Sequence, residues 1–295
     1  MTEEVIKKET YLDLHDIFNV LWKKKFQVLI FSLISAIFSL FYSLSLNDYY
    51  NSSATIQMSA DQESSSISPL GGLASIVGIS SASGGDKFNY ASEVLMTRSF
   101  FKHLIEKEPE ILPNLTAFDY FDKNKKISFF DDDIYKEDKW IEKKPSYLEG
   151  FEEYKNIFII NPDQDLGFIK VSVIHESPYF SRFLIDVAIR ELNNLSKNMD
   201  ISDAKKSIEY LEKEFNSTSY EQIKLSINNL ITKELEKLMV ASVKNYYLVK
   251  YIEPPFLPER KSGPTRSLIC IFITFLGFMS AVFFILIKEF IFKKT

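Results

Sequence analysis

The chain has 295 residues, of which 46% are hydrophobic and 15% aromatic, and its formal net charge is −5. This acidic balance gives no reason to expect nucleic-acid binding. The single cysteine, Cys270, excludes a disulfide within the chain, so we expect stability to come from packing.

Two uncharged apolar stretches lie near opposite ends of the chain, at residues 26–46 and 268–287. Each is about long enough to cross a ~30 Å hydrocarbon core as a helix. Because a helix satisfies its own backbone hydrogen bonds, these stretches are predicted to be two transmembrane helices. The polar segment between them, residues 47–267, is then expected to form one domain outside the membrane.

Charges beside the first stretch predict the orientation. Lys23, Lys24 and Lys25 precede it and Asp48 follows it, so the positive-inside bias places the N-terminal segment, residues 1–25, in the cytoplasm. Two spans return the tail, residues 288–295, to the same side. No small-residue cleavage pattern ends the first stretch, and we therefore expect a retained span and not a cleaved signal peptide.

Before the first span, residues 11–22 carry apolar side chains at helical spacing, which predicts a short amphipathic helix at the cytoplasmic interface. Residues 49–58 are typical of a strand. A Ser- and Gly-rich stretch follows at residues 64–85. Its apolar part, residues 70–79, is interpreted either as a mobile loop or as a surface for subunit contact.

Asp86 is predicted to cap a helix that runs to about residue 107. Residues 109–154 alternate short apolar groups with charges and are expected to hold small helices. Residues 157–160 and 168–174 read as two strands joined by turn residues, which predicts a hairpin.

The pattern then changes to long helices, predicted over about residues 178–216 and 219–247. Ser177 is a good N-cap with Pro178 in the first helical position, and Ser219 with Gln222 forms a capping-box pattern for the second helix. A strand at residues 248–252 is expected to join the earlier strands. The fold class is therefore predicted as α+β, with a membrane-proximal base and a protruding helical hairpin.

Four segments carry a family resemblance: residues 12–22, 204–215, 230–241 and the proline-rich segment 253–264 directly before the second span. In these segments the chain resembles Wzz-type polysaccharide chain-length determinants, of the short class without a kinase domain. The resemblance covers both ends and most of the second half, and the proline-rich segment is its most specific element. No Gly-rich loop followed by Lys-Ser/Thr occurs, which disfavours the larger relatives with a kinase.

The resemblance implies a polysaccharide co-polymerase of the bacterial inner membrane with a periplasmic main domain. Such proteins form ring-like homo-oligomers and set how many repeat units a Wzy-type polymerase adds to the O-antigen of lipopolysaccharide or a related glycan. The implied partners are other copies of the chain, the polymerase, the growing lipid-linked polysaccharide and membrane lipids. No cofactor and no enzymatic activity are implied.

The proline-rich segment is a candidate connector. Its prolines fix φ and favour extended neighbours, so the segment either transmits changes between the domain outside the membrane and the second span or merely stops the preceding structure from continuing. Its cations either pair with phosphates of lipids, including a polyprenyl-pyrophosphate carrier, or simply contact headgroups. The candidate residues are Pro254, Pro255, Pro258, Arg260, Lys261, Pro264 and Arg266.

Small residues mark both spans. In the first span they share one helical face, and in the second they form a small-xxx-small pair, which allows close approach of helices. The two spans either pack on each other within one chain or pack against neighbouring subunits or the polymerase. The residues are Ser32, Ser35, Ala36, Ser39, Ser43, Gly277 and Ala281.

No catalytic or metal-binding constellation is evident. His15, His103 and His175 are far apart in the sequence, and the Asp131–Asp133 run lacks the other positions of a calcium loop. The main alternative function is a two-span membrane sensor or scaffold that signals through a separate partner. A periplasmic glycan hydrolase would need a carboxylate pair in a cleft, which no motif singles out.

Overall fold

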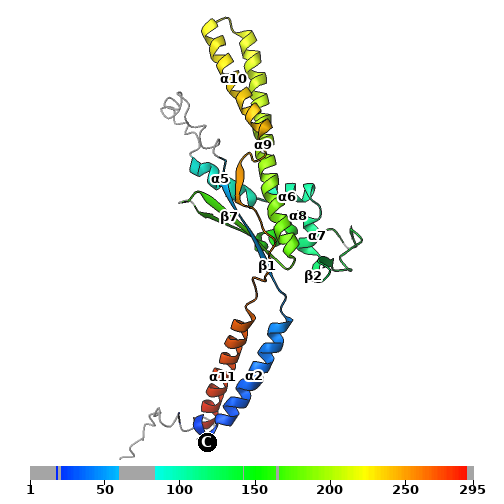
Figure 1. Cartoon of the computed structure of the whole chain (residues 1–295), viewed down its shortest axis with the longest axis vertical. Helices are drawn as coiled ribbons and strands as arrows, with labels where there is room; N and C mark the ends of the chain where they lie inside the picture. Colours follow the sequence, from blue (N-terminus) through cyan, green and yellow to red (C-terminus); the bar gives the residue numbers. More distant parts are fainter. Residues whose placement is uncertain (1–17, 19–20, 60–83, 142, 164–165, 291–295) are drawn as a thin grey trace, which may run out of the picture. The chain divides into compact units, whose positions relative to one another are not determined.

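The computed structural model describes residues 18, 21–59, 84–141, 143–163 and 166–290 (Figure 1). Most of the predicted amphipathic helix at residues 11–22, and the stretch at residues 70–79, lie outside the described residues. The chain divides into two compact units. One combines Met1–Asp48 with Ser262–Thr295, and the other is Tyr49–Lys261.

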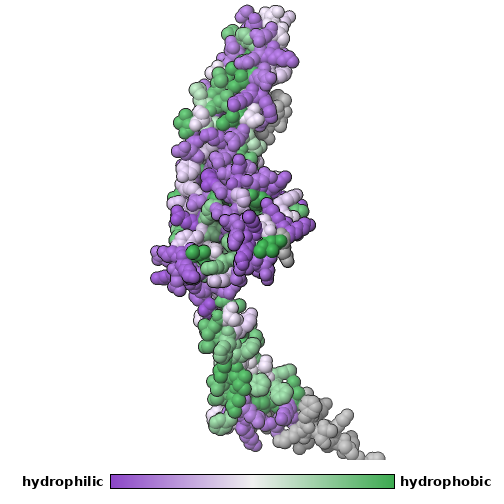
Figure 2. Space-filling view, turned by 90° about the vertical axis from the view of Figure 1, so that its right-hand side faces the viewer, coloured by the Kyte–Doolittle hydropathy of each residue, from purple (hydrophilic) through white to green (hydrophobic). Residues whose placement is uncertain are grey.

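The first unit contains two antiparallel helices, α2 (Lys25–Ser45) and α11 (Arg266–Phe290). Both are long and apolar enough to cross a membrane. Their large side chains are mostly exposed, as Phe38 and Phe283 show at 66% and 68%, and Figure 2 shows the hydrophobic surface of this pair. A helix from the core of a soluble protein would bury such side chains. The two candidate membrane helices of the predicted fold are therefore present.

The second unit is built on a four-stranded antiparallel sheet with the order β6-β7-β1-β8. In this sheet Ile56 of β1 lies opposite Ile169 of β7 on one side and Tyr251 of β8 on the other. The predicted hairpin and the predicted pairing of the last strand are confirmed. The strands are β1 (Tyr50–Met58), β6 (Phe158–Asp163), β7 (Phe168–His175) and β8 (Val249–Glu253).

The core lies on one face of this sheet. Alternate residues of β1 are buried, as the two-residue period of a strand requires, and they pack against helices. The N-terminal half of α9 (Pro178–Ser217) supplies much of the cover, including Leu184, Ile185 and Leu192. The mixed helix-and-sheet class is therefore as predicted.

The single helix predicted over residues 86–107 is wrong. The structure has two helices there, α5 (Gly84–Leu95) and α6 (Arg98–Lys107). Thr97 separates them because its backbone is extended and its Oγ1 accepts a hydrogen bond from the Phe100 N–H at 3.2 Å. Thr97 is therefore the N-cap of α6. The apolar spacing continues across it, which is why the sequence predicts a single helix.

The prediction of small helices over residues 109–154 is incomplete. Two helices are present, α7 (Ile111–Thr116) and α8 (Tyr147–Ile157), but two short antiparallel ribbons lie between them. Their turns place Lys126, Glu137 and Asp138 at positive φ without any glycine, so the sequence lacks the usual turn signal. The ribbon strands are β2 (Phe118–Asp122), β3 (Ile127–Phe130), β4 (Tyr135–Lys136) and β5 (Lys139–Trp140).

The long helical hairpin is formed by α9 and α10 (Glu221–Val243). Ser177 caps α9, with Pro178 in its first turn, and its 40 residues extend about 60 Å at ~1.5 Å per residue. The predicted Ser219–Gln222 capping box is wrong. Tyr220 is still extended and occupies the N-cap position of α10, with no side-chain cap.

Candidate functional site

The pair of α2 and α11 is held together at its middle by a small-residue contact. Ser35 Oγ donates a hydrogen bond to the carbonyl oxygen of Ile273 at 3.1 Å. Gly277 faces Ser35 so closely that a Cβ at position 277 would collide with the serine side chain. Close helix approach at this point therefore requires glycine.

The other small residues lie along the same helix pair. Ser39 and Ser43 are 1% and 2% exposed, and Ala281 is 3% exposed. Ser43 Oγ donates a hydrogen bond to the Arg266 carbonyl of the other helix at 3.4 Å. Ser39 Oγ donates to the Ala36 carbonyl of its own helix at 2.8 Å. The structure thus shows that these residues lie at the contact between α2 and α11 of the same chain. Their part in contacts with other proteins stays a prediction.

Ion pairs join the two helices at both ends. Lys24 Nζ lies 2.6 Å from Glu289 Oε2 at one end. At the other end, Arg266 Nη2 donates to Asp48 Oδ1 at 3.0 Å and to the Leu46 carbonyl at 2.9 Å. Both pairs are partly buried, so they are screened by salt less than exposed pairs would be.

These acidic partners were missed by the sequence analysis. A signal for them exists, because each apolar stretch is preceded by a cation and followed by an acidic residue. Lys24 and Asp48 bracket the first stretch, and Arg266 and Glu289 bracket the second. In an antiparallel pair, that order brings unlike charges together at each end.

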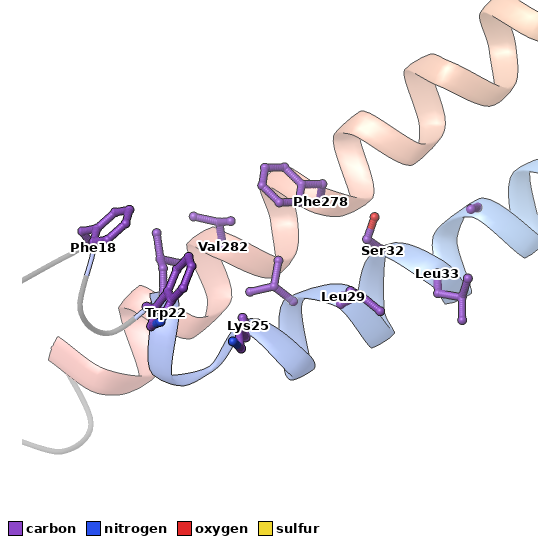
Figure 3. A pocket seen from close by; sticks show the side chains of 11 residues that line it. Phe18, Trp22, Lys25, Leu29, Ser32, Leu33, Phe278 and Val282 are labelled. Carbon is purple, nitrogen blue, oxygen red and sulfur yellow. The ribbon is translucent and has the colours of Figure 1, made fainter.

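An apolar groove of about 660 Å³ runs along this helix pair (Figure 3). It is lined by the small residues Ser32 and Ala36 of α2 and by bulky side chains, including Leu29, Leu33 and Phe278. At one end of the groove, Lys25 Nζ lies 4.8 Å from the centre of the Trp22 ring, a cation–π contact. The predicted small face is therefore only partly covered by α11.

The connector prolines differ in their environments. Pro255 and Pro258 are buried in the Tyr49–Lys261 unit, whereas Pro254 is exposed and Pro264 is half-buried. Ser52 of β1 is fully buried and donates from Oγ to the Phe256 carbonyl at 2.7 Å. The start of the connector is thus fixed to the central strand of the sheet.

The three connector cations are also not equivalent. Arg260 and Lys261 are exposed, while Arg266 is engaged by Asp48 and Leu46. The structure brings Arg266 together with the small-residue face of the helix pair. It leaves the charged groups of Arg260 and Lys261 at the surface of the other unit.

A polar cluster joins α6 to α9. Glu191 is 6% exposed and accepts hydrogen bonds from His103, Arg190 and Asn194 at 3.0–3.2 Å. Burial raises the pKa of this carboxyl, but the hydrogen bonds from His103, Arg190 and Asn194, together with the Arg190 charge, outweigh burial, so its pKa lies below the usual value. Arg190 also contacts Glu108 at 2.5 Å.

His175 is a buried histidine to which the sequence analysis assigned no role. Its Nδ1 accepts from the Ser177 N–H at 3.0 Å, and its Nε2 lies 3.1 Å from the Asn114 carbonyl. Burial lowers its pKa to about 4. This histidine is neutral at pH 7 and fixes the start of α9 beside the end of β7. Within the described part of the chain, no three His, Cys, Asp or Glu side chains gather to hold a metal ion.

Comparisons with known proteins agree with the resemblance read from the sequence. Residues 10–108 match the model of the Wzz family, described as chain length determinant protein. No curated protein matches the chain. The resemblance to the Wzz family is therefore confirmed over these residues.

Similar solved structures include a full-length bacterial polysaccharide co-polymerase. It is 13% identical, the match covers 94% of this chain and 97% of that one, and the TM-score is 0.39. Another is a fragment of WzzB, a polysaccharide co-polymerase from Salmonella Typhimurium, at 12% identity and a TM-score of 0.31, covering 74% of this chain and 100% of that fragment.

Proposed function

We propose that this chain, whose residues 10–108 carry the Wzz chain length determinant match, regulates the modal chain length of a surface polysaccharide. The family match is the observation that carries the proposal. The O-antigen of lipopolysaccharide is the proposed polymer, and a related surface glycan is the alternative. The candidate membrane helices and the long helical hairpin of the fold support this assignment.

The proposed location is the bacterial inner membrane. The lysines at positions 23–25 favour cytoplasmic termini, and the Tyr49–Lys261 unit then lies in the periplasm. That unit would meet a glycan assembled on the periplasmic side.

The proposed assembly is a ring-like homo-oligomer. Its support is an apolar row on the exposed side of α10, where Leu235, Met239 and Val243 follow at intervals of four residues and are 46%, 60% and 82% exposed. Figure 2 shows hydrophobic patches on the hairpin among hydrophilic residues. Exposed apolar surface of this kind marks interaction sites.

The proposed partner in the membrane is a Wzy-type polymerase. The groove on the α2–α11 pair combines small residues with bulky apolar side chains, a surface on which another apolar helix can pack. Arg260 and Lys261 are proposed to contact lipid phosphates, and the growing lipid-linked polysaccharide completes the set of partners. The role is regulatory, so the chain contributes no reaction step of its own.

The test is the length distribution of surface polysaccharide, displayed as a gel ladder, in a strain deleted for this gene. We expect the preferred band cluster to disappear on deletion and to return on complementation. A ladder unchanged by deletion would contradict O-antigen length control and favour a two-span sensor that signals through a separate partner.

A further inference from the structure

The Tyr49–Lys261 unit contains a hollow of about 410 Å³ beside β8, lined by both polar and apolar side chains. One wall is a face of α9, and the other is β8 together with the segment that leads into it from α10. The side chains that matter are Asp186, Arg190, Asn194, Asn245, Tyr246 and Tyr251. The volume lies in the range of ~300–1,000 Å³ that is typical of small-molecule sites.

The walls of this hollow are fixed before any ligand binds. Asn193 is buried and makes four hydrogen bonds: its amide group donates to the Ile189 and Val249 carbonyls, and its Oδ1 accepts from the Leu248 and Val249 N–H groups. These bonds tie β8 to α9. A site held in this way loses little conformational entropy on binding.

The segment that carries Asn245 and Tyr246 is also held at both sides. Lys197 Nζ donates to the Lys244 carbonyl at 3.4 Å, and the Tyr247 hydroxyl donates to Asp200 Oδ2 at 2.6 Å. Tyr246 itself is 50% exposed, and its ring packs edge-on against Tyr251 at 6.0 Å between centroids. An aromatic side chain is thus presented to the hollow on a fixed backbone.

The charges around the hollow argue against an anionic ligand. Arg190 is engaged by Glu108 and Glu191, and Arg182 lies 3.8 Å from Asp186. Three carboxylates therefore lie beside two guanidinium groups and offset their positive charge. The Tyr251 hydroxyl donates to Asp186 Oδ1 at 3.3 Å.

The remaining groups suit an uncharged sugar. The amides of Asn194 and Asn245 each offer a donor and an acceptor, which is what a ring of sugar hydroxyls requires. The exposed Tyr246 ring offers an apolar face to the C–H side of a pyranose, with a hydroxyl at its edge.

We propose that this hollow binds one or two uncharged sugar units of a polysaccharide, with Tyr246 as the stacking residue and Asn194 and Asn245 as the hydrogen-bonding residues. The inference rests on the proposed function, because it makes the regulated glycan the ligand. It adds a direct contact between the Tyr49–Lys261 unit and the polymer.

The experiment uses the full-length protein in detergent and the delipidated surface polysaccharide of the same bacterium, released by mild acid. Saturation-transfer NMR reports which sugar protons contact the protein. The test variant combines Asn245→Ala with Tyr246→Ala. The control combines Tyr210→Ala with Asn228→Ala, which removes the same two residue types from exposed positions on the hairpin.

We expect the wild type and the control to bind the polysaccharide and the test variant to bind about tenfold more weakly, the loss of one stacking contact and one hydrogen bond. Equal binding by the test variant and the wild type would overturn the proposal, as would the absence of any transfer to the wild type. Binding of inorganic pyrophosphate that Tyr246→Ala abolishes would also overturn it, because the site would then be anionic.

The gel ladder separates this inference from the proposed function. If deletion of the gene removes the preferred band cluster while the test variant binds and regulates as the wild type does, the sugar site fails and length control stands. If deletion leaves the ladder unchanged while the test variant loses binding, the sugar site stands and the proposed function fails.

Discussion

The contact between α2 and α11 depends on single residues whose size or charge fits the residue opposite. Gly277 leaves room for Ser35, and the unlike charges of Lys24–Glu289 and Asp48–Arg266 meet at the two ends. Apolar side chains gain little from meeting each other in lipid, so such polar and small-residue contacts decide how two membrane helices pair.

Asp48→Asn is expected to weaken the helix pair. The substitution removes the charge that Arg266 faces at 3.0 Å and leaves a partly buried guanidinium with a weaker acceptor. We expect a loss of about 1.5–2 kcal/mol, the lower part of the range for a hydrogen bond to a charged group, because asparagine still accepts a hydrogen bond. Thermal unfolding in detergent measures it. A double-mutant cycle with Arg266→Gln supplies the control, and additive losses would show that the two residues are not coupled.

His175 is expected to make stability depend on pH. Burial lowers its pKa from 6.5 to about 4, so the folded state binds fewer protons than the unfolded state between these values. Stability is therefore full above pH 6.5 and is lost as pH falls toward 4. Between pH 7 and pH 5 this residue is expected to cost about 2 kcal/mol.

The measurement is urea unfolding of the wild type and of His175→Gln at both pH values. The variant keeps a neutral hydrogen-bonding side chain and should lose the part of the pH dependence that His175 contributes. Glu191, whose pKa is also lowered, is unchanged in both proteins. An identical pH dependence in the two proteins would show that His175 is not buried as a neutral group.

At the scale of elements, the pairing of α2 with α11 can be tested through the single native cysteine. Cys270 Sγ lies 3.7 Å from the Ser39 carbonyl, so Ser39→Cys places a second thiol beside it. Under oxidation we expect a fast-migrating monomer on a non-reducing gel. Leu33→Cys, whose side chain is 56% exposed, is the control that should not cross-link within the chain. A dimer band from Ser39→Cys would instead place neighbouring subunits at this contact.

The connector is expected to influence glycan length. Pro255 and Pro258 are buried, and the Ser52 bond to Phe256 fixes the segment between them. Replacing Pro254 and Pro258 with alanine frees φ at two positions and should loosen this segment. We expect a shift in the modal length on the gel ladder at equal expression. Pro162→Ala, at an exposed position of β6, is the matched control, and a ladder unaltered by the connector change would count against a transmitting role.

Elements with strong local signals were predictable from the sequence. The two apolar helices, the long hairpin and the sheet strands follow from hydrophobic period and composition. The failures have local causes. Thr97 divides a helix whose apolar pattern continues across it, and the ribbon turns at Lys126 and Asp138 use positive φ without glycine. The hollow beside β8 was not predictable, because it joins α9 to a segment about 50 residues later and depends on Asn193, which no motif marks.

The proposed role of the whole molecule depends on its assembly with other copies. The exposed row of Leu235, Met239 and Val243 is the surface proposed to contact another copy. Changing Leu235 and Met239 together to glutamate places charge in that contact and should reduce the oligomer to smaller species, measured as mass by light scattering in detergent. Ser226→Glu, exposed on another side of α10, is the control. An unchanged mass would exclude this row as the subunit contact.

Reconstitution with the polymerase tests the regulation of polymer length most directly. The Wzy-type polymerase of the same bacterium, in vesicles with lipid-linked repeat units, is expected to produce a broad distribution of glycan lengths by itself. Adding the full-length chain should gather the products around one preferred length. A distribution that is the same with and without the chain would contradict the proposed regulation of polymer length.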